Sequence, residues 1–488
     1  MSLAARIGDQ FKTEFIAKIV SMVSGALLAI LLARLLQPES YGVLFLSLSI
    51  LGTLNLFSKL GISKSGARYI SEFKETDVSQ IPGIICISFL YVTLTSAVVG
   101  VCLFVARYPV TSVLNEPELV PFLTIGIFYI ALTTYTTFVR RTLQGLEDIK
   151  PAGAVHALES GSRFVFAVGL VLLGFGALGA LGGYILSSLV ATVAGCVYIY
   201  LRHVRPTGGV SWPADGLPRR IAEYSLPLTA TRSADVLDKR VDTILVGFFL
   251  TPTAVSFYTI GKQVAGFVQS PASALGFTVS PTYGSLQTQG ETDKAANVLE
   301  ESLTHILLLY LPAAAGLILV AEPMVRLVFG NEYTGATPVV QLLALYAVLH
   351  AVASLVSNGL DYLGRARERA IIKTVTSVLN VVLNVIFIPR VGVVGAAAAT
   401  VVTFSLYTVA NLYIMHIEFS LNGAYIADRL SRILVITLLM ALPVAAILTR
   451  SVGVLALIGA VASGVLVWFA LSTTIGWLEP RRIAALVR

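Results

Sequence analysis

Apolar runs, each about 20 residues long, recur along the whole chain and leave few folds open to it. A run of this length matches an α-helix that crosses the hydrocarbon core of a bilayer, and it is about twice as long as a membrane β-strand. Only 12% of the residues are charged, whereas ordinary soluble domains carry roughly 25%. The pattern therefore predicts an all-α, polytopic membrane protein.

The runs predict about 14 transmembrane helices, of which the seventh is the least apolar because its first half is charged. Residues 1–12 are polar and the first run is too long for a cleavable signal, so we expect it to remain as the first helix. The expected spans are 13–36, 41–60, 82–106, 119–141, 152–175, 178–202, 226–250, 254–282, 301–321, 338–362, 370–389, 392–417, 428–449 and 453–476.

Basic residues are distributed unevenly between the two sides that this arrangement defines. Most Lys and Arg residues fall on the termini and the even-numbered connections, and the other side carries only Arg34, Arg107, Arg326, Arg390 and Arg450. The positive-inside rule then predicts a protein of the cell membrane with both termini in the cytoplasm. The net charge of +7 lies in short loops and forms no basic stripe, so nucleic acid is not an expected partner.

Two pairs of segments indicate an internal duplication. Residues 31–46 resemble residues 245–260, with Pro38 on Pro252, and residues 176–184 resemble residues 392–400 at a nearly equal offset. The expected layout is two parallel six-helix lobes related by this repeat, with a cavity between them and two further helices. The predicted divisions are an N-terminal lobe, a C-terminal lobe and a terminal helix pair, at 1–208, 218–417 and 428–476.

Charged side chains inside apolar spans are costly and usually face a cavity or a partner. In the seventh span such residues share one helical face and alternate in sign: Arg232, Asp235, Lys239 and Asp242. One interpretation is a self-neutralised ladder at the end of a helix. The alternative is a charged cavity wall that binds a phosphate or a coupling ion, and the two interpretations have similar weight.

Three other spans carry candidate charges. In the fifth, Glu159 precedes Arg163 by one turn, so the two side chains form either an interfacial salt bridge or, with Arg163 released, a pyrophosphate contact. In the first, Lys18 either extends to the membrane surface or contributes to a gate. Lys262 is the only charge in the eighth span, which favours a functional role.

Two spans carry polar faces. Asp361 shares a face of the tenth span with His350, and Asn380 shares one of the eleventh span with Lys373. Such faces often hold helices together, which is the favoured interpretation. They also suit a hydroxyl-rich sugar.

Enzyme signatures are missing from the sequence. It has no phosphate-binding loop of the Gly-rich type, no zinc-protease motif and no metal-spaced cluster of Cys and His. Its Cys residues lie singly in apolar segments. We expect no catalysis, no cofactor and no bound metal, and any energy source is an ion gradient, the membrane potential or the substrate gradient.

Several segments, in order along the chain, resemble those of polysaccharide-type flippases of the multidrug/oligosaccharidyl-lipid/polysaccharide exporter superfamily. They are LARLLQPESYGVLFLSLSIL, GISKSGARYISEF, LQGLEDIKP, RVDTILVGFFLTPTAVSFY, VFGNEY and PRVGVVGAAAAT. In the fourth, Asp242, Gly247 and Tyr258 fall where such flippases commonly have Asp, Gly and Tyr. The loops favour an archaeal N-glycosylation member.

The resemblance implies export, by alternating access, of a saccharide on a polyprenyl or dolichyl (pyro)phosphate carrier, for cell-surface polysaccharide or N-glycan assembly. Implied partners are membrane lipid, a coupling proton or sodium ion, and glycan synthesis machinery. An ion-coupled drug/cation antiporter of the same superfamily is an alternative, disfavoured because the first lobe has no deep isolated acid. Others are a membrane-embedded polysaccharide polymerase or ligase, which generally needs a long extracytoplasmic loop, and a scaffold of a glycan synthesis complex.

Overall fold

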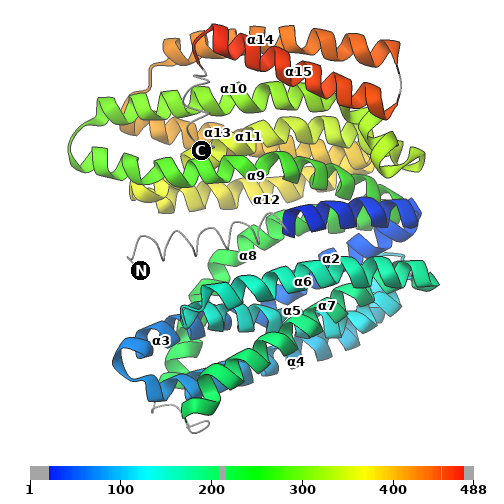
Figure 1. Cartoon of the computed structure of the whole chain (residues 1–488), viewed down its shortest axis with the longest axis vertical. Helices are drawn as coiled ribbons and strands as arrows, with labels where there is room; N and C mark the ends of the chain where they lie inside the picture. The colour runs from blue at the N-terminus through cyan, green and yellow to red at the C-terminus, as the bar shows by residue number, and fades with distance from the viewer. Residues whose placement is uncertain (1–20, 208–215, 452, 478–488) are drawn as a thin grey trace. The chain divides into compact units, whose positions relative to one another are not determined.

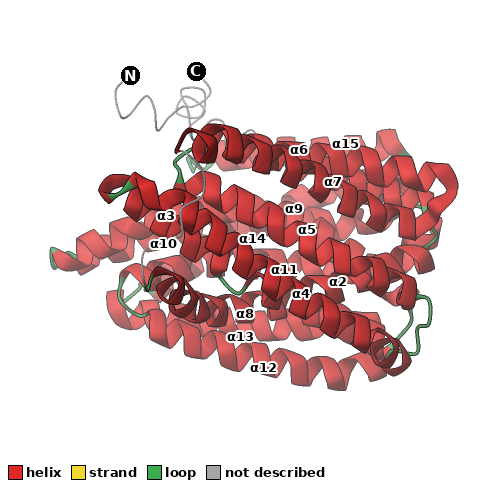
Figure 2. Ribbon diagram, turned by 90° about the horizontal axis from the view of Figure 1, so that it is seen from below, coloured by secondary structure: helices red, strands yellow, loops and turns green. Residues whose placement is uncertain are grey.

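The computed structural model describes residues 21–207, 216–451 and 453–477. These residues form helices joined by short connections, with no strand among them (Figure 2). The chain divides into two compact units, residues 1–255 and 256–488. Each unit is described by itself.

The first unit contains a helix at Ser21–Leu35 and seven further long helices in chain order (Figure 1). These are α2 (Pro38–Lys59), α3 (Ile62–Thr76), α4 (Ile81–Val113), α5 (Leu119–Gly145), α6 (Ile149–Leu170), α7 (Gly176–Ile199) and α8 (Leu217–Phe249). Short 3-10 or π segments lie at Val78–Gln80, Val171–Phe175, Tyr200–Val204 and Arg205–Thr207. Helix α5 is central because it packs against α2, α3, α4, α6 and α7.

The second unit takes up most of α9 and the helices that follow. They are α9 (Pro252–Thr288), α10 (Thr292–Met324), α11 (Thr337–Tyr362), α12 (Ala366–Val391), α13 (Val393–Phe419), α14 (Gly423–Arg450) and α15 (Val454–Thr474), with short segments at Val325–Phe329 and Asn331–Ala336. Helix α13 packs against α11 and α12, while α14 and α15 pack together and against α10. The indole of Trp468 donates to the Leu308 carbonyl at 2.8 Å, which fixes α15 on α10.

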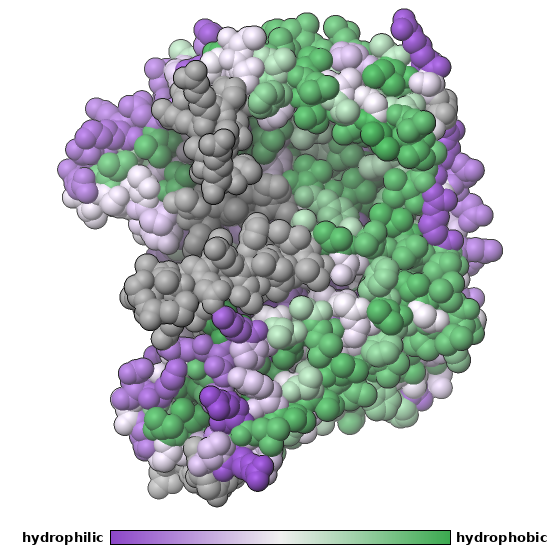
Figure 3. Space-filling model, in the orientation of Figure 1, coloured by the Kyte–Doolittle hydropathy of each residue, from purple (hydrophilic) through white to green (hydrophobic). Residues whose placement is uncertain are grey.

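The side chains on the flanks of these helices are apolar, as a membrane environment requires. Leu173 is 74% exposed and Leu455 is 86% exposed, and no soluble protein leaves many such residues in water. Figure 3 shows hydrophobic surface along the helix flanks and polar residues gathered at helix ends. The chain is a multi-pass membrane protein.

Within the described residues each expected span overlaps a helix, so the all-helical architecture predicted from sequence is confirmed. Among the described residues, 10 segments are long and apolar enough to cross a membrane. The number of 14 crossings therefore stays a prediction. Helix α3 was not expected, because its polar sequence indicated a connection between spans.

The duplication indicated by sequence has counterparts in the helices. Pro38 begins α2 and Pro252 begins α9. The Thr192 hydroxyl of α7 donates to the Leu132 carbonyl of α5 at 3.4 Å. The Thr408 hydroxyl of α13 donates to the Leu349 carbonyl of α11 at the same distance, 3.4 Å. The two units therefore share a helix-packing pattern at matched positions.

Candidate functional site

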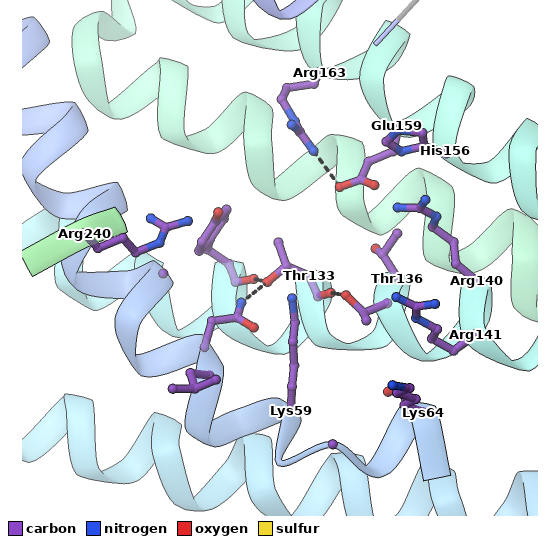
Figure 4. Close-up of a pocket in the computed structure, with 17 residues that line it drawn as sticks. Lys59, Lys64, Thr133, Thr136, Arg140, Arg141, His156, Glu159, Arg163 and Arg240 are labelled. Atoms are coloured by element: carbon purple, nitrogen blue, oxygen red, sulfur yellow. Dashed lines mark hydrogen bonds and ion pairs between the residues drawn. The ribbon is translucent and has the colours of Figure 1, made fainter. Parts of the chain in front are cut away.

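The first unit encloses a cavity of about 440 Å³, within the range of small-molecule sites. Helices α2, α3, α5, α6 and α8 contribute its walls. Figure 4 shows side chains from these helices converging on it from opposite sides. All of its lining residues belong to this unit.

Positive charge dominates the walls of this cavity. Among the described residues, six Lys or Arg side chains and a single carboxylate, Glu159, line it; the cations are Lys59, Lys64, Arg140, Arg141, Arg163 and Arg240. His156 adds an imidazole. Like charges in a confined, partly apolar site repel each other strongly because screening there is weak. An anionic ligand would relieve that repulsion, so the cavity is suited to bind one.

Glu159 and Arg163 lie one turn apart on α6 and form an ion pair, Arg163 Nη2 to Glu159 Oε1, of 2.5 Å. Glu159 is 8% exposed, and the Arg163 guanidinium lies 5.0 Å from the ring centroid of Tyr184. The Arg163 Nε has no hydrogen-bond partner among the described residues. Arg163 is thus held in place by Glu159 and Tyr184 while it keeps a donor for a further partner.

Arg240 reaches the cavity from α8. Its Nη1 donates to the Leu48 carbonyl on α2 at 2.7 Å. The guanidinium lies directly over Gly52, where an added Cβ would be 2.1 Å from Arg240 Cζ. Glycine at position 52 therefore makes the space in which this cation lies.

Neutral polar side chains form the rest of the lining. Tyr129, Thr133, Thr136 and Thr137 come from α5, and the Asn55 amide of α2 donates to the Thr133 hydroxyl. Behind them, the Ser58 hydroxyl hydrogen-bonds with those of Ser96 and Thr134, at 2.8 Å and 3.0 Å. This network ties α2, α4 and α5 together and gives the cavity hydroxyl and amide groups beside its cations.

Of the ten residues proposed from sequence, Glu159 and Arg163 line this cavity. Asp242 lies on α8 of the same unit and is 4% exposed. The side chains of Arg232, Asp235 and Lys239, although on α8, lie outside the described part of the structure, as does Lys18. The charged ladder of the seventh span therefore stays a prediction.

The other three candidates lie in the second unit and are not brought to one place by the contacts described. Lys262 Nζ lies 5.3 Å from the Tyr258 ring centroid. Asp361 pairs with Arg369 at 2.9 Å. Asn380 donates to the Thr403 hydroxyl at 3.2 Å and accepts from Asn384 at 3.0 Å. The contacts of Asp361 and Asn380 fit helix packing, the favoured interpretation of the polar faces. The functional role expected of Lys262 stays a prediction.

Sequence reasoning missed most of the cavity's cations. Lys59, Lys64, Arg140 and Arg141 were assigned to connections, where they counted only toward the orientation of the chain. In the structure they lie at or near helix ends that meet at the cavity. The signal that could have found them is their position: each falls within a few residues of an apolar span rather than in mid-loop.

Known proteins resemble this chain in sequence. A family model described as "Polysaccharide biosynthesis protein" matches residues 31–338. The probable low-salt glycan biosynthesis flippase Agl15 of Haloferax volcanii is 29% identical over 38% of this chain and 39% of its own length. The lipopolysaccharide biosynthesis protein WzxC of Escherichia coli is 24% identical over 82% of this chain and 77% of its own.

The chain thus spans about two-fifths of Agl15 but more than three-quarters of WzxC. Among solved structures, the lipid II flippase MurJ in an inward closed conformation matches with a TM-score of 0.75 and 15% identity, over 97% of this chain and 99% of that one. An inward-facing MATE multidrug resistance transporter matches with a TM-score of 0.69 and 16% identity, over 82% and 94%. At these identities the likeness is one of fold.

Proposed function

The chain belongs to the polysaccharide biosynthesis protein family, and on that premise we propose that it is a flippase for a lipid-linked saccharide. It moves a saccharide on a polyprenyl or dolichyl (pyro)phosphate carrier from the cytoplasmic to the outer leaflet by alternating access. The relatives named as flippases support this proposal, and so does the lipopolysaccharide biosynthesis relative. Its role is transport, without catalysis.

The observation that carries the proposal is the excess of cations in the cavity of the first unit. A carrier (pyro)phosphate is compact and highly anionic, and Arg guanidinium groups match its oxygen geometry in bidentate fashion. Arg140, Arg141 and Arg163 are the groups that would bind it. The wall of Thr and Asn side chains beside them offers the many modest hydrogen bonds that suit a saccharide.

The same observation disfavours the antiporter alternative. Among the side chains that the structure describes, six positive charges face one carboxylate, and this excess would repel an organic cation from the cavity. The fold shared with a MATE transporter does not bear on the substrate, because one scaffold can serve different cargoes.

We place the protein in the cell membrane with both termini in the cytoplasm, coupled to a proton or sodium ion and working beside glycan synthesis machinery. The lobes at 1–208 and 218–417, with the helix pair at 428–476, are the proposed units of duplication. The sequence asymmetry of Lys and Arg supports the orientation.

The test is transport by the purified full-length chain in proteoliposomes. A polyprenyl diphosphate that carries a short saccharide is placed in the vesicles, and its arrival in the opposite leaflet is followed with an impermeant lectin. We expect arrival to require the protein and to be inhibited by inorganic pyrophosphate. Arrival at the rate of protein-free vesicles, together with uptake of an organic cation, would overturn the proposal in favour of the antiporter.

A deletion strain gives an independent result in the cell. We expect lipid-linked glycan to accumulate on the cytoplasmic leaflet when the protein is missing. Normal delivery of the glycan to the outer leaflet in that strain would contradict the flippase proposal.

A further inference from the structure

The start of α3 is unusual in its geometry and lies at the wall of the cavity. Helix α2 ends at Lys59, and the chain turns through two consecutive left-handed residues, Leu60 (φ 36°) and Gly61 (φ 68°). Helix α3 then begins at Ile62. Gly61, Ser63 and Lys64 all line the cavity, so the turn brings the first turn of α3 to it.

The N-terminus of α3 lacks the groups that usually neutralise a helix start. The first amide groups of a helix have no carbonyl partner within it, and together they carry a partial positive charge. Gly61 occupies the N-cap position and provides no side chain to accept from them, and the first turn contains no acidic residue. Lys64 lies in that turn instead, where its charge opposes the helix dipole. The electrostatics of this end are therefore suited to an anion.

Ser63, in the first turn of α3, has a buried hydroxyl. Its side chain is 6% exposed, and its hydroxyl has no hydrogen-bond partner among the described residues. Buried polar groups are rarely left unsatisfied, and those that are call for an explanation. Since Ser63 belongs to the cavity lining, a ligand oxygen in the cavity would satisfy this hydroxyl.

Helix α3 is also held firmly in place. The hydroxyl of Ser65 donates to the Ile221 carbonyl of α8 at 3.0 Å. A Cβ added at Gly145 of α5 would lie 2.5 Å from the Ala67 carbonyl oxygen, so the backbones of α3 and α5 touch. The donors at the start of α3 thus keep a fixed position beside Arg140 and Arg141, which lie on α5.

We propose that the N-terminus of α3 is a phosphoryl-binding subsite of the cavity. The amide groups of Ile62 and Ser63 and the Ser63 hydroxyl donate to phosphoryl oxygens, while Lys59 and Lys64 balance the charge. Helix N-termini bind phosphate in this way in other folds. The inference rests on the proposed function and deepens it, because it assigns recognition of the carrier's phosphate to backbone and hydroxyl donors, apart from the arginines.

The choice of phosphate over a sugar hydroxyl follows from charge. The subsite offers two backbone amides and two Lys side chains, which only donate, and one hydroxyl, of Ser63, which can donate or accept. Its net positive charge therefore favours an anion over a neutral hydroxyl. A subsite of this kind recognises the carrier phosphate, which all the proposed lipid-linked substrates share. It therefore gives affinity for the carrier without selecting the sugar.

The experiment measures pyrophosphate binding by calorimetry to the full-length protein in nanodiscs. The variants are Ser63→Ala, which removes the hydroxyl, and Lys64→Glu, which places a carboxylate at the helix start. We expect affinity to fall about tenfold in the first and more than a hundredfold in the second.

Lys64→Glu should also raise the melting temperature of the ligand-free protein, because the new carboxylate complements the helix dipole. Lys294→Gln, which alters an exposed Lys paired with Glu291 in the second unit, is the control and should bind as wild type does.

A second arm identifies the source of the phosphate. Nanodiscs that contain a polyprenyl phosphate should show weaker pyrophosphate binding by the wild-type protein, because the carrier competes for the subsite. Unchanged pyrophosphate affinity in those nanodiscs would refute the assignment to a lipid carrier. Affinities of Ser63→Ala and Lys64→Glu within twofold of wild type would refute the subsite itself.

These outcomes are separate from the fate of the proposed function. If Arg140→Gln abolishes binding and transport while both α3 variants behave as wild type, the flippase proposal stands and the subsite is wrong. If the α3 variants lose pyrophosphate binding but wild-type protein fails to move the lipid-linked saccharide, the anion site stands and the flippase proposal is wrong.

Discussion

The two units carry different chemistry at matching positions of the repeat. In the first unit, positions on α5 and α6 hold Arg140, Arg141, Glu159 and Arg163. In the second unit, the corresponding positions on α11 and α12 hold Ser357, Asn358, Thr376 and Asn380. The first set is charged and lines a cavity, while the second set is neutral.

Contacts within each unit define this register. The matched bonds of Thr192 to Leu132 and of Thr408 to Leu349 align α5 with α11. A Cβ added at Gly179 would approach Leu170 at the end of α6, and one added at Gly395 would approach Phe387 on α12. The same helix pairs meet at the same places in both units.

The difference shows how one scaffold can hold two kinds of interior. Asn380 is 7% exposed. Its side-chain amide donates a hydrogen bond to Thr403 of α13 and accepts one from Asn384, one turn further along α12. Lys373 lies 5.0 Å from the Phe404 ring centroid. In the second unit these two side chains contact neighbouring helices, whereas in the first unit the charged side chains line a cavity. The proposed anion binding would accordingly belong to the first copy.

The largest effect on transport should come from replacing the two adjacent arginines of α5 in the first unit. In Arg140→Gln/Arg141→Gln we expect transport to fall more than a hundredfold, because each lost charge-assisted contact is worth about tenfold or more. The measurement is lectin access in proteoliposomes. Ser357→Ala, at the matching position of the second unit, should transport within about twofold of wild type. Comparable losses in both variants would show that the two units contribute alike.

The next effect separates transport from stability. Arg163→Gln/Glu159→Gln removes the ion pair without leaving a buried charge, so transport should fall about tenfold or more with membrane abundance unchanged. Asn380→Ala should instead lower stability and leave transport unchanged. It loses about 1 kcal/mol of helix packing and lowers the melting temperature, while transport per folded molecule persists. Thermal melting and transport are measured on the same preparations, and an abundance loss in the first variant would contradict this division.

A glycine pair gives a smaller and more specific contrast. Gly52→Ala would push the Arg240 guanidinium off α2, since the new Cβ would be 2.1 Å from Arg240 Cζ. A flexible side chain can move away, so we expect little change in melting temperature and a roughly tenfold loss of pyrophosphate affinity. Gly266, at the matching offset from Pro252, would meet no atom within 4 Å. Gly266→Ala should bind pyrophosphate normally, and an equal loss there would exclude displacement of Arg240 as the cause.

The smallest effect is expected at Lys262 of the second unit. Lys262→Gln removes a cation–π contact with Tyr258, and we expect transport to fall about twofold to fivefold with abundance unchanged. Leu48 stands at the matching position of the first unit. A loss as large as that of the arginine variants would move Lys262 into the binding machinery. A parallel loss of abundance would favour a packing role.

Sequence placed the helices well because each long apolar run has one physical explanation in a bilayer. It missed α3, whose polar residues such as Lys64 and Arg68 resemble those of a loop while Tyr69 and Ile70 are buried. A short amphipathic helix is not distinguished from a connection by hydropathy alone.

The cavity was predicted only in part, at Glu159 and Arg163, because those two lie within one span. Lys59 and Arg140 belong to helices far apart in the chain, and their convergence depends on how α2 packs against α5. The sequence predicts the depth of such charges in the membrane, but it does not predict which helices pack side by side. The position of the Arg240 guanidinium depends in addition on Gly52, where any larger residue would occupy its space.

The contact of α3 with α5 has a use in following conformational change. Where Gly145 meets Ala67, two backbones touch and leave no room for sliding. A pair of spin labels on the exposed faces of these helices would report one constant separation through the transport cycle. That separation is an internal standard against which movement of any other helix pair can be read.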